Sequence, residues 1–218
     1  SFVPVINEFK GAFRYLDSRD NIFWFYTTFE APKGKVVSLT FLDGDNFQWN
    51  DVVPESKDTI SGVNLVGNKI IINYLKDTLS NIQLFDLSGQ YLLNLEIEGL
   101  GTVQGFDGGL EDKYTFFEFE NFISPPKIYR LDLTSLEYEL FWQMNVPGLE
   151  EDELITALKF FSSKDGTMIP VHVSQQAGLQ VNKNTPVLLY GYGGFNISIL
   201  PSFSKTFYTW MKQGGVLA

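Results

Sequence analysis

A pattern that recurs at intervals in the forties constrains the fold more than any other feature of this 218-residue chain. Similar cycles begin at Asn21, Asn68 and Asp112, which lie 47 and 44 residues apart. Each cycle has an aromatic or β-branched segment, a polar loop, a segment with neighbouring leucine and aspartate, a turn and a closing apolar segment. A period of this length with about four strands per repeat is typical of β-propeller blades. We therefore predict three blades in residues 1–147.

The predicted strands within these cycles alternate apolar and polar residues, and turn-forming residues separate them. A turn is expected at residues 43–46, where the sequence is DGDN. Propellers close with about four to eight blades, so three blades require further segments to complete the ring. The expected strands are residues 21–29, 35–42, 47–53, 69–75, 81–87, 91–97, 114–119, 127–133 and 139–146.

Residues 148–218 differ from the repeats in charge. The chain has 16 basic and 26 acidic residues, and its formal net charge of −10 belongs entirely to residues 1–147. Residues 148–218 hold five residues of each sign, and no carboxylate follows Asp165. This asymmetry supports a domain boundary near residues 147–148.

The second part of the chain predicts the beginning of an α/β sheet. A hairpin over residues 154–174 precedes a strand at 187–190 that is apolar throughout, as expected for burial on both faces. A helix at 201–212, with Ser202 as its cap, and an apolar strand at 216–218 would complete a β-α-β unit.

Composition excludes several classes of function. The chain has no cysteine, which excludes disulfide scaffolds, cysteine-based metal sites and cysteine nucleophiles. The acidic balance argues against nucleic acid and anionic membrane surfaces as partners, because both favour lysine and arginine. No apolar run approaches the roughly 20 residues that span a bilayer, and no signal peptide is visible. We expect a cytoplasmic monomer.

The most informative motif is YGYGGF at residues 190–195, which follows the carboxyl end of the apolar strand, where α/β folds bind ligands. Three interpretations are open. The glycines could serve a turn that needs positive φ, although this leaves the interleaved aromatic residues unexplained. Phosphate binding is disfavoured, because Asn196 stands where the third glycine of G-x-G-x-x-G would fall. The third interpretation is an oxyanion hole with a tyrosine hydroxyl as donor.

Longer stretches around this motif resemble the prolyl oligopeptidase family. The run PVLLYGYGGFNISILPSFS with GGVLA downstream is similar to the start of that family's peptidase domain, and SSKDGTMIPV resembles its first hairpin. The segment FENFISPPKIYRLDL at 119–133 is similar to its later propeller blades. The resemblance implies part of a seven-bladed propeller followed by the N-terminal portion of an α/β-hydrolase domain. It also implies hydrolysis of short peptides after proline by serine, aspartate and histidine, with no metal or organic cofactor.

Two site residues follow from this resemblance by motif position. Tyr192 matches the family's oxyanion-hole tyrosine, whose hydroxyl would donate to the developing oxyanion. Phe195 matches the phenylalanine that lines the pocket for the substrate's proline, and an aromatic wall suits the flat apolar ring. The competing interpretation is that both are packing aromatics, and the matched flanking residues favour the functional roles.

The catalytic triad is missing from the sequence. There is no G-x-S-x-G nucleophile elbow, and the one histidine, His172, lies on the predicted hairpin before the oxyanion loop. In α/β-hydrolases the serine, the acid and the histidine all come later in the chain, so we expect the triad beyond Ala218 and His172 as a surface or hairpin residue.

Three other candidate sites fail on their patterns. The DGDN turn at 43–46 departs from a calcium-binding loop, because Phe47 and Pro54 occupy ligand positions. The acidic run at 150–153 is interpreted as solvated, and the glycosylation pattern at 196–198 has no meaning in a cytoplasmic protein.

The chain is therefore interpreted as an internal segment of a prolyl-oligopeptidase-like serine peptidase. Residues 1–147 would be the last three propeller blades and residues 148–218 the incomplete start of the catalytic domain. Its partners would be short proline-containing peptides and the remaining segments of the same enzyme, and the 218 residues alone should be inactive. Two alternatives stay open, a transpeptidase that cyclises peptides after proline and a non-catalytic peptide-binding protein.

Overall fold

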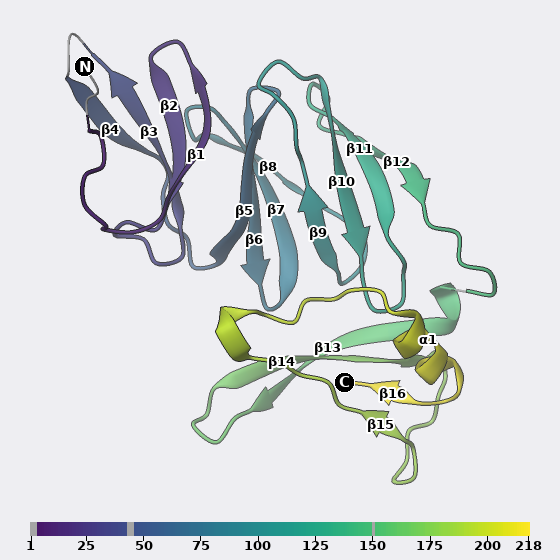
Figure 1. Ribbon diagram of the computed structural model, residues 1–218. Helices are drawn as coiled ribbons and strands as arrows, with labels where there is room; N and C mark the ends of the chain where they lie inside the picture. Colours follow the sequence, from purple (N-terminus) through teal and green to yellow (C-terminus); the bar gives the residue numbers. More distant parts are fainter. Residues whose placement is uncertain (1–3, 43–45, 150) are drawn as a thin grey trace.

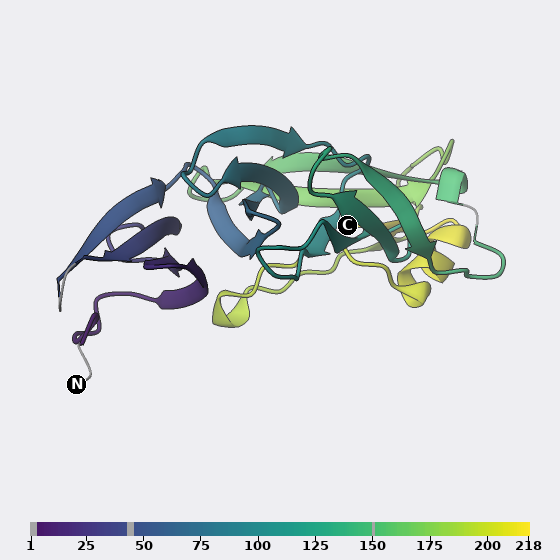
Figure 2. The same cartoon turned by 90° about the horizontal axis from the view of Figure 1, so that it is seen from above.

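Three four-stranded antiparallel sheets follow one another in chain order (Figure 1). The structure is a computed structural model that describes residues 4–42, 46–149 and 151–218, and the three sheets lie within these ranges. Consecutive strands pair in each sheet, as in the blades of a propeller, and Figure 2 shows the sheets from above. Blade 1 is β1 (Phe13–Arg19), β2 (Ile22–Thr27), β3 (Lys35–Phe41) and β4 (Phe47–Val53); blade 2 is β5 (Thr59–Val66), β6 (Lys69–Lys76), β7 (Leu79–Asp86) and β8 (Tyr91–Leu95); blade 3 is β9 (Thr102–Gly105), β10 (Tyr114–Glu120), β11 (Lys127–Asp132) and β12 (Tyr138–Gln143).

The blades confirm the predicted repeat, but each blade begins one strand earlier than the predicted cycle. The sequence pattern predicts nine of the described blade strands and misses β1, β5 and β9, the first strand of each blade. Strand β9 has four residues, and β5 contains a glycine among polar residues, so neither has a clear apolar period. Pairing with β6 and β10 defines these strands instead. Of the predicted turn at 43–46, residues 43–45 lie outside the described residues.

Apolar side chains between neighbouring blades form two buried clusters. Strand β6 contributes to both, because successive side chains of a strand point to opposite faces. Ile70 and Ile72 belong to the cluster between blades 1 and 2, and Ile71 belongs to the cluster between blades 2 and 3. The central sheet is therefore buried on both faces, and the blades pack face to face.

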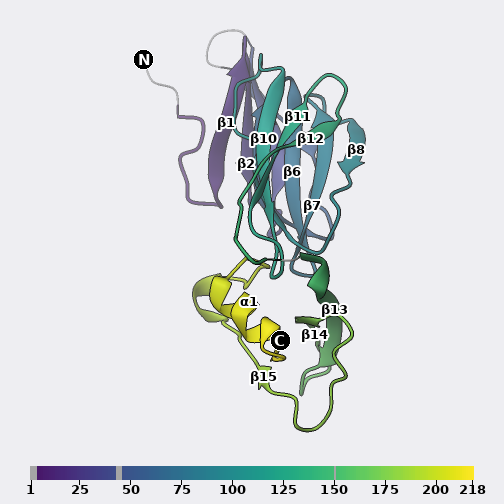
Figure 3. The ribbon, with the colours of Figure 1, turned by 90° about the vertical axis from the view of Figure 1, so that its right-hand side faces the viewer.

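The second unit is a mixed sheet with one helix, and it lies below the blades (Figure 3). Its strand order is β13-β14-β16-β15; β15 and β16 are parallel, and β14 is antiparallel to β13 and to β16. Met211 of the helix and Leu217 of β16 are buried with Leu154 in a small core. The elements are β13 (Leu154–Ser162), β14 (Met168–Gln176), β15 (Val187–Leu188), α1 (Lys205–Lys212) and β16 (Val216–Leu217).

The helix begins later than the sequence predicts. Helix α1 starts at Lys205, and its cap is Ser204 rather than Ser202. The backbone N–H of Phe203 donates to the Glu120 carboxylate at 2.9 Å, and Thr102 donates to the Pro201 carbonyl at 2.7 Å. These bonds to blade 3 hold the preceding residues out of the helix, so the prediction that it starts at residue 201 is wrong.

The predicted strand at 187–190 is also shorter and more exposed than expected. Strand β15 has two residues, and Leu189 is 77% exposed, so burial on both faces is wrong for the described residues. The hydrogen-bonded neighbour β16 covers one edge of β15, whereas α1 packs against β14 and β16. By contrast, Val216 and Leu217 are buried as predicted.

No helix in the described parts of the chain combines the length and the apolar character needed to cross a bilayer.

Candidate functional site

The YGYGGF loop lies in the layer between the blades and the second sheet (Figure 1; Figure 3). It leaves the carboxyl end of β15, where the Tyr190 N–H donates to the Ala218 carbonyl at 2.8 Å. The Tyr190 ring packs against Phe207 of α1 with a centroid separation of 5.7 Å. The start of the loop is thus fixed to the sheet and to the helix.

Tyr192 carries the candidate donor hydroxyl of the loop. Its side chain is 51% exposed, so it is not a buried packing aromatic in the described chain. The tip of its ring lies over Gly194, because a Cβ at Gly194 would be only 2.7 Å from the Tyr192 hydroxyl oxygen. The side chain is therefore half-exposed, and its hydroxyl rests against the backbone of the same loop.

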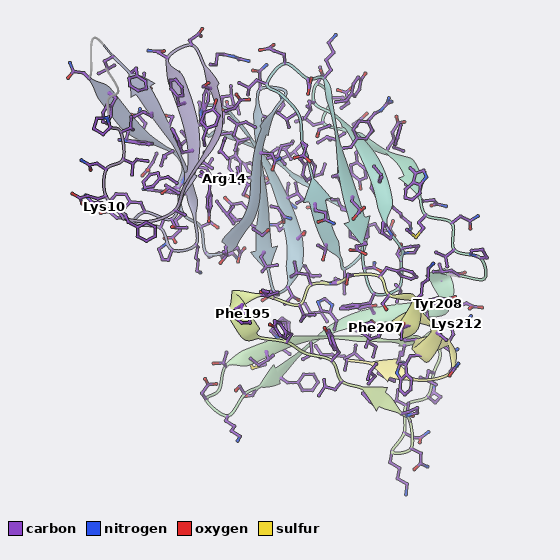
Figure 4. The ribbon with its side chains drawn as sticks, in the orientation of Figure 1. Lys10, Arg14, Phe195, Phe207, Tyr208 and Lys212 are labelled. Atoms are coloured by element: carbon purple, nitrogen blue, oxygen red, sulfur yellow. The ribbon has the colours of Figure 1, made fainter. Side chains whose placement is uncertain are left out.

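Phe195 lies at the far end of the loop, below the blades (Figure 4), and its side chain is 93% exposed. It belongs to the short 3₁₀ turn Gly194–Asn196 and has a φ of 54°. The glycines of the motif do not have left-handed φ values; Phe195 does. The interpretation that these glycines provide positive φ is therefore wrong, and the strained residue is the phenylalanine, whose ring faces solvent.

The segment that follows the loop and leads into α1 is anchored to blade 3. The bonds from Thr102 to Pro201 and from Phe203 to Glu120 tie the segment before α1 to β9 and to the end of β10. Phe122, in the loop after β10, packs into the core formed with Leu154 and Met211. No local sequence pattern points to Thr102, Glu120 or Phe122 as contact residues, because contacts between distant parts of the chain bring them into place.

The helix is held by its own set of polar contacts (Figure 4). The Tyr208 hydroxyl donates to the Gly148 carbonyl at 3.0 Å, and Lys212 pairs with Glu153. The predicted solvated acidic run thus includes one carboxylate with a structural partner. Residue 150 of that run lies outside the described residues.

His172 lies on β14, as predicted for a hairpin residue, but it is half-buried between the two units. The Thr78 hydroxyl, in the turn between β6 and β7, lies 2.7 Å from Nε2, and the Phe122 ring centroid lies 5.4 Å from the imidazole centroid. Nδ1 is buried without a hydrogen-bond partner among the described residues. Burial lowers the pKa of His172, because desolvation disfavours the charged imidazolium.

No other described feature competes with this loop as a reaction site. A cavity of about 430 Å³ on the outer face of blade 1 is lined by apolar residues such as Phe13 and Trp49 and by polar or charged residues such as Lys35 and Asp51. The described residues contain no cluster of three or more histidine or acidic side chains that could hold a metal ion. The candidate chemistry therefore centres on the hydroxyl of Tyr192.

Comparison with known proteins defines the class. The profile described as the prolyl oligopeptidase N-terminal β-propeller domain matches residues 1–143, which confirms the blades and shows that the chain belongs to the prolyl oligopeptidase family. A prolyl endopeptidase of Elizabethkingia miricola is 32% identical over 217 residues, covering 100% of this chain and 30% of the relative. The dual function macrocyclase-peptidase POPB of Amanita bisporigera is 26% identical over 218 residues, covering 98% of this chain and 30% of the relative.

The fold is also similar to solved structures of the family. A chain from a structural and mechanistic analysis of two prolyl endopeptidases aligns with a TM-score of 0.87 and 26% identity. That alignment covers 97% of this chain and 31% of the solved chain, so it extends well beyond the matched propeller residues. The chain spans about a third of the length of the relatives it matches.

Proposed function

We propose that this chain is an internal segment of a prolyl-oligopeptidase serine peptidase. Residues 1–147 are its last three propeller blades, and residues 148–218 are the start of its α/β-hydrolase domain. The parallel pair β15 and β16, connected through α1, is the β-α-β arrangement that such a domain requires. The alignment of 97% of the chain with a prolyl endopeptidase structure supports the same assignment.

One observation carries the proposal: a half-exposed tyrosine in a loop at the carboxyl end of a strand that pairs in parallel. In α/β-hydrolases the corresponding loop supplies an oxyanion donor. When a serine attacks the carbonyl carbon of the substrate's proline residue, negative charge develops on the carbonyl oxygen, and the Tyr192 hydroxyl donates a hydrogen bond to it. A backbone N–H beside the nucleophile would be the second donor.

Phe195 forms one wall of the pocket for the substrate's proline. Its ring is almost fully accessible, so a pyrrolidine ring can stack on it without displacing other side chains. Burial of the two apolar rings favours proline over polar residues at this position. The propeller covers the site and restricts it to short peptides.

The triad comes from residues beyond Ala218. His172 is not the general base, because its Nε2 is engaged by Thr78 and its ring is packed against Phe122. No cysteine is present to replace the serine nucleophile. The segment contributes the donor and the pocket wall, and the rest of the enzyme contributes nucleophile, base and acid.

The test is Tyr192→Phe in the full-length protein, assayed on a short peptide with an internal proline. We expect kcat to fall by roughly 10²- to 10³-fold, because the hydrogen bond that the variant cannot make is formed only in the transition state. KM should be nearly unchanged. Tyr190→Phe is the matched control, since it removes a hydroxyl from the same loop and keeps the ring against Phe207. An unchanged kcat for Tyr192→Phe would refute the assignment.

A second candidate reaction is transfer of the acyl group to an amine of the same peptide, which gives a cyclic product. The 26% identical relative named a dual function macrocyclase-peptidase favours it. The same oxyanion donor serves both reactions, because both pass through an acyl-enzyme. Mass spectrometry separates them, since the hydrolysed product is heavier than the cyclic product by one water.

A further inference from the structure

We propose that Gly194 is a positioning residue for the Tyr192 hydroxyl, and this inference rests on the oxyanion role proposed for Tyr192. The missing side chain of Gly194 leaves the space that the tip of the tyrosine ring occupies. Any side chain at this position would displace the donor.

The contact is specific to Tyr192. A Cβ at Gly194 would lie 2.7 Å from the Tyr192 hydroxyl oxygen, 3.0 Å from Cζ and 3.5 Å from Cε2. These three nearest atoms all belong to the end of one flexible side chain, and none of them is backbone. An alanine would therefore be accommodated by moving the hydroxyl and not by moving the chain.

Backbone conformation does not require glycine at this position. Gly194 is absent from the described residues with left-handed φ, so alanine there has no left-handed strain. A glycine is usually required either for its backbone conformation or for the absence of a side chain. At Gly194 only the second reason applies. The substitution should thus preserve the fold while changing the position of one polar atom.

The expected displacement is large on the scale of catalysis. Relieving a 2.7 Å contact to the 3.4 Å of ordinary van der Waals contact requires a shift of about 0.7 Å. Oxyanion donors act at about 2.7–3.1 Å, and a misplacement of about 1 Å can cost roughly 100-fold in rate. The hydroxyl would leave its working distance although it is still present.

Gly191 offers a control in the same loop. Apart from its two chain neighbours, a Cβ at Gly191 would meet nothing within 4 Å, and Gly191 is absent from the described residues with left-handed φ. Gly191→Ala adds the same methyl group to the same loop. The Tyr192→Phe background is the second control, because it removes the hydroxyl that Gly194→Ala would displace.

The experiment measures kcat and KM of full-length Gly194→Ala, Gly191→Ala, Tyr192→Phe and the double variant Tyr192→Phe with Gly194→Ala. We expect Gly194→Ala to lower kcat roughly 10- to 100-fold with KM within about twofold, and Gly191→Ala to match the parent. In the Tyr192→Phe background, Gly194→Ala should cause no further loss, because the hydroxyl is already gone.

Each other outcome has a defined meaning. If Tyr192→Phe is impaired and Gly194→Ala is not, the positioning role fails and the oxyanion role stands. The positioning role would also be overturned if Gly194→Ala lowered kcat equally in the parent and in the Tyr192→Phe background. The same holds if the Gly194→Ala variant no longer unfolded in a cooperative thermal transition. An unimpaired Tyr192→Phe would instead refute the proposed function itself.

Discussion

His172 illustrates how one side chain can join two parts of the molecule. Its hydrogen bond to Thr78 links β14 to the turn between β6 and β7, and its ring contacts Phe122 from blade 3. The sequence predicts the hairpin on which it lies but not this contact, because the partners are 94 and 50 positions away in the chain. At the residue scale, motif matching predicts Tyr192 and Phe195 as site residues, whereas the residues that anchor the segment after their loop depend on tertiary pairing.

The contact of His172 should weaken in acid. Burial lowers its pKa, so an exposed imidazole takes up a proton at a higher pH than the buried one. The contact is therefore at full strength above the ordinary pKa of about 6.5 and is lost as the pH falls through the lowered value. The imidazolium carries an N–H on both ring nitrogens, and its Nδ1–H has no acceptor among the described residues.

Hydrogen exchange of the full-length protein measures this effect. Protection of the amides at residues 76–80 and 171–174, corrected for intrinsic rates, should fall several-fold between about pH 8 and about pH 5. His172→Phe keeps a ring against Phe122 and has no titratable group, so its protection should not depend on pH in this range. A fall of equal size in both proteins would contradict the role of the histidine.

At the scale of single elements, tertiary contacts set boundaries that local propensity does not. The pattern at 201–212 predicts a helix correctly, but contacts of Pro201 and Phe203 with blade 3 delay its start to Lys205. The blade strands with strong apolar periods are all predicted. The first strand of each blade is not, because a short or polar strand is defined by its partner and not by its own residues.

A turn of blade 2 that lies against blade 1 gives a prediction at this scale. Gly89, between β7 and β8, has a φ of +89°, and a Cβ there would lie 1.9 Å from the Val52 carbonyl oxygen of β4. Gly166, in the β13–β14 turn, has a φ of +86° with nothing within 4 Å. Alanine at either position has a similar left-handed strain, but only Gly89→Ala must also push blades 1 and 2 apart.

We therefore expect Gly89→Ala to be the less stable variant by roughly 1–3 kcal/mol, the usual cost of overpacking. The measurement is the urea midpoint of each full-length variant against the parent, with Gly166→Ala as the control for strain. Equal midpoints for the two variants would mean that the blades can separate at no cost and would contradict the close contact.

At the scale of the whole molecule, the sequence repeat predicted the propeller blades, and the propeller profile matches residues 1–143. The domain boundary expected near residues 147–148 stays a prediction. The way the two units meet could not be predicted, because it rests on scattered single residues such as Thr78, Glu120 and Phe122. Such contacts have no period and no motif.

The last prediction concerns the 218 residues as a separate polypeptide. Cleavage after proline by the proposed mechanism requires a nucleophile, a base and an acid that act on one carbonyl. The one histidine of the sequence is held by Thr78, and no carboxylate follows Asp165. An oxyanion donor alone does not give a reaction, because without a nucleophile no tetrahedral oxyanion forms. We therefore expect the isolated polypeptide to release no chromophore from a Gly-Pro-linked substrate, while the full-length protein does. Turnover by the purified segment that is abolished in its Tyr192→Phe variant would require a nucleophile within these residues and would contradict the proposed division of the active site.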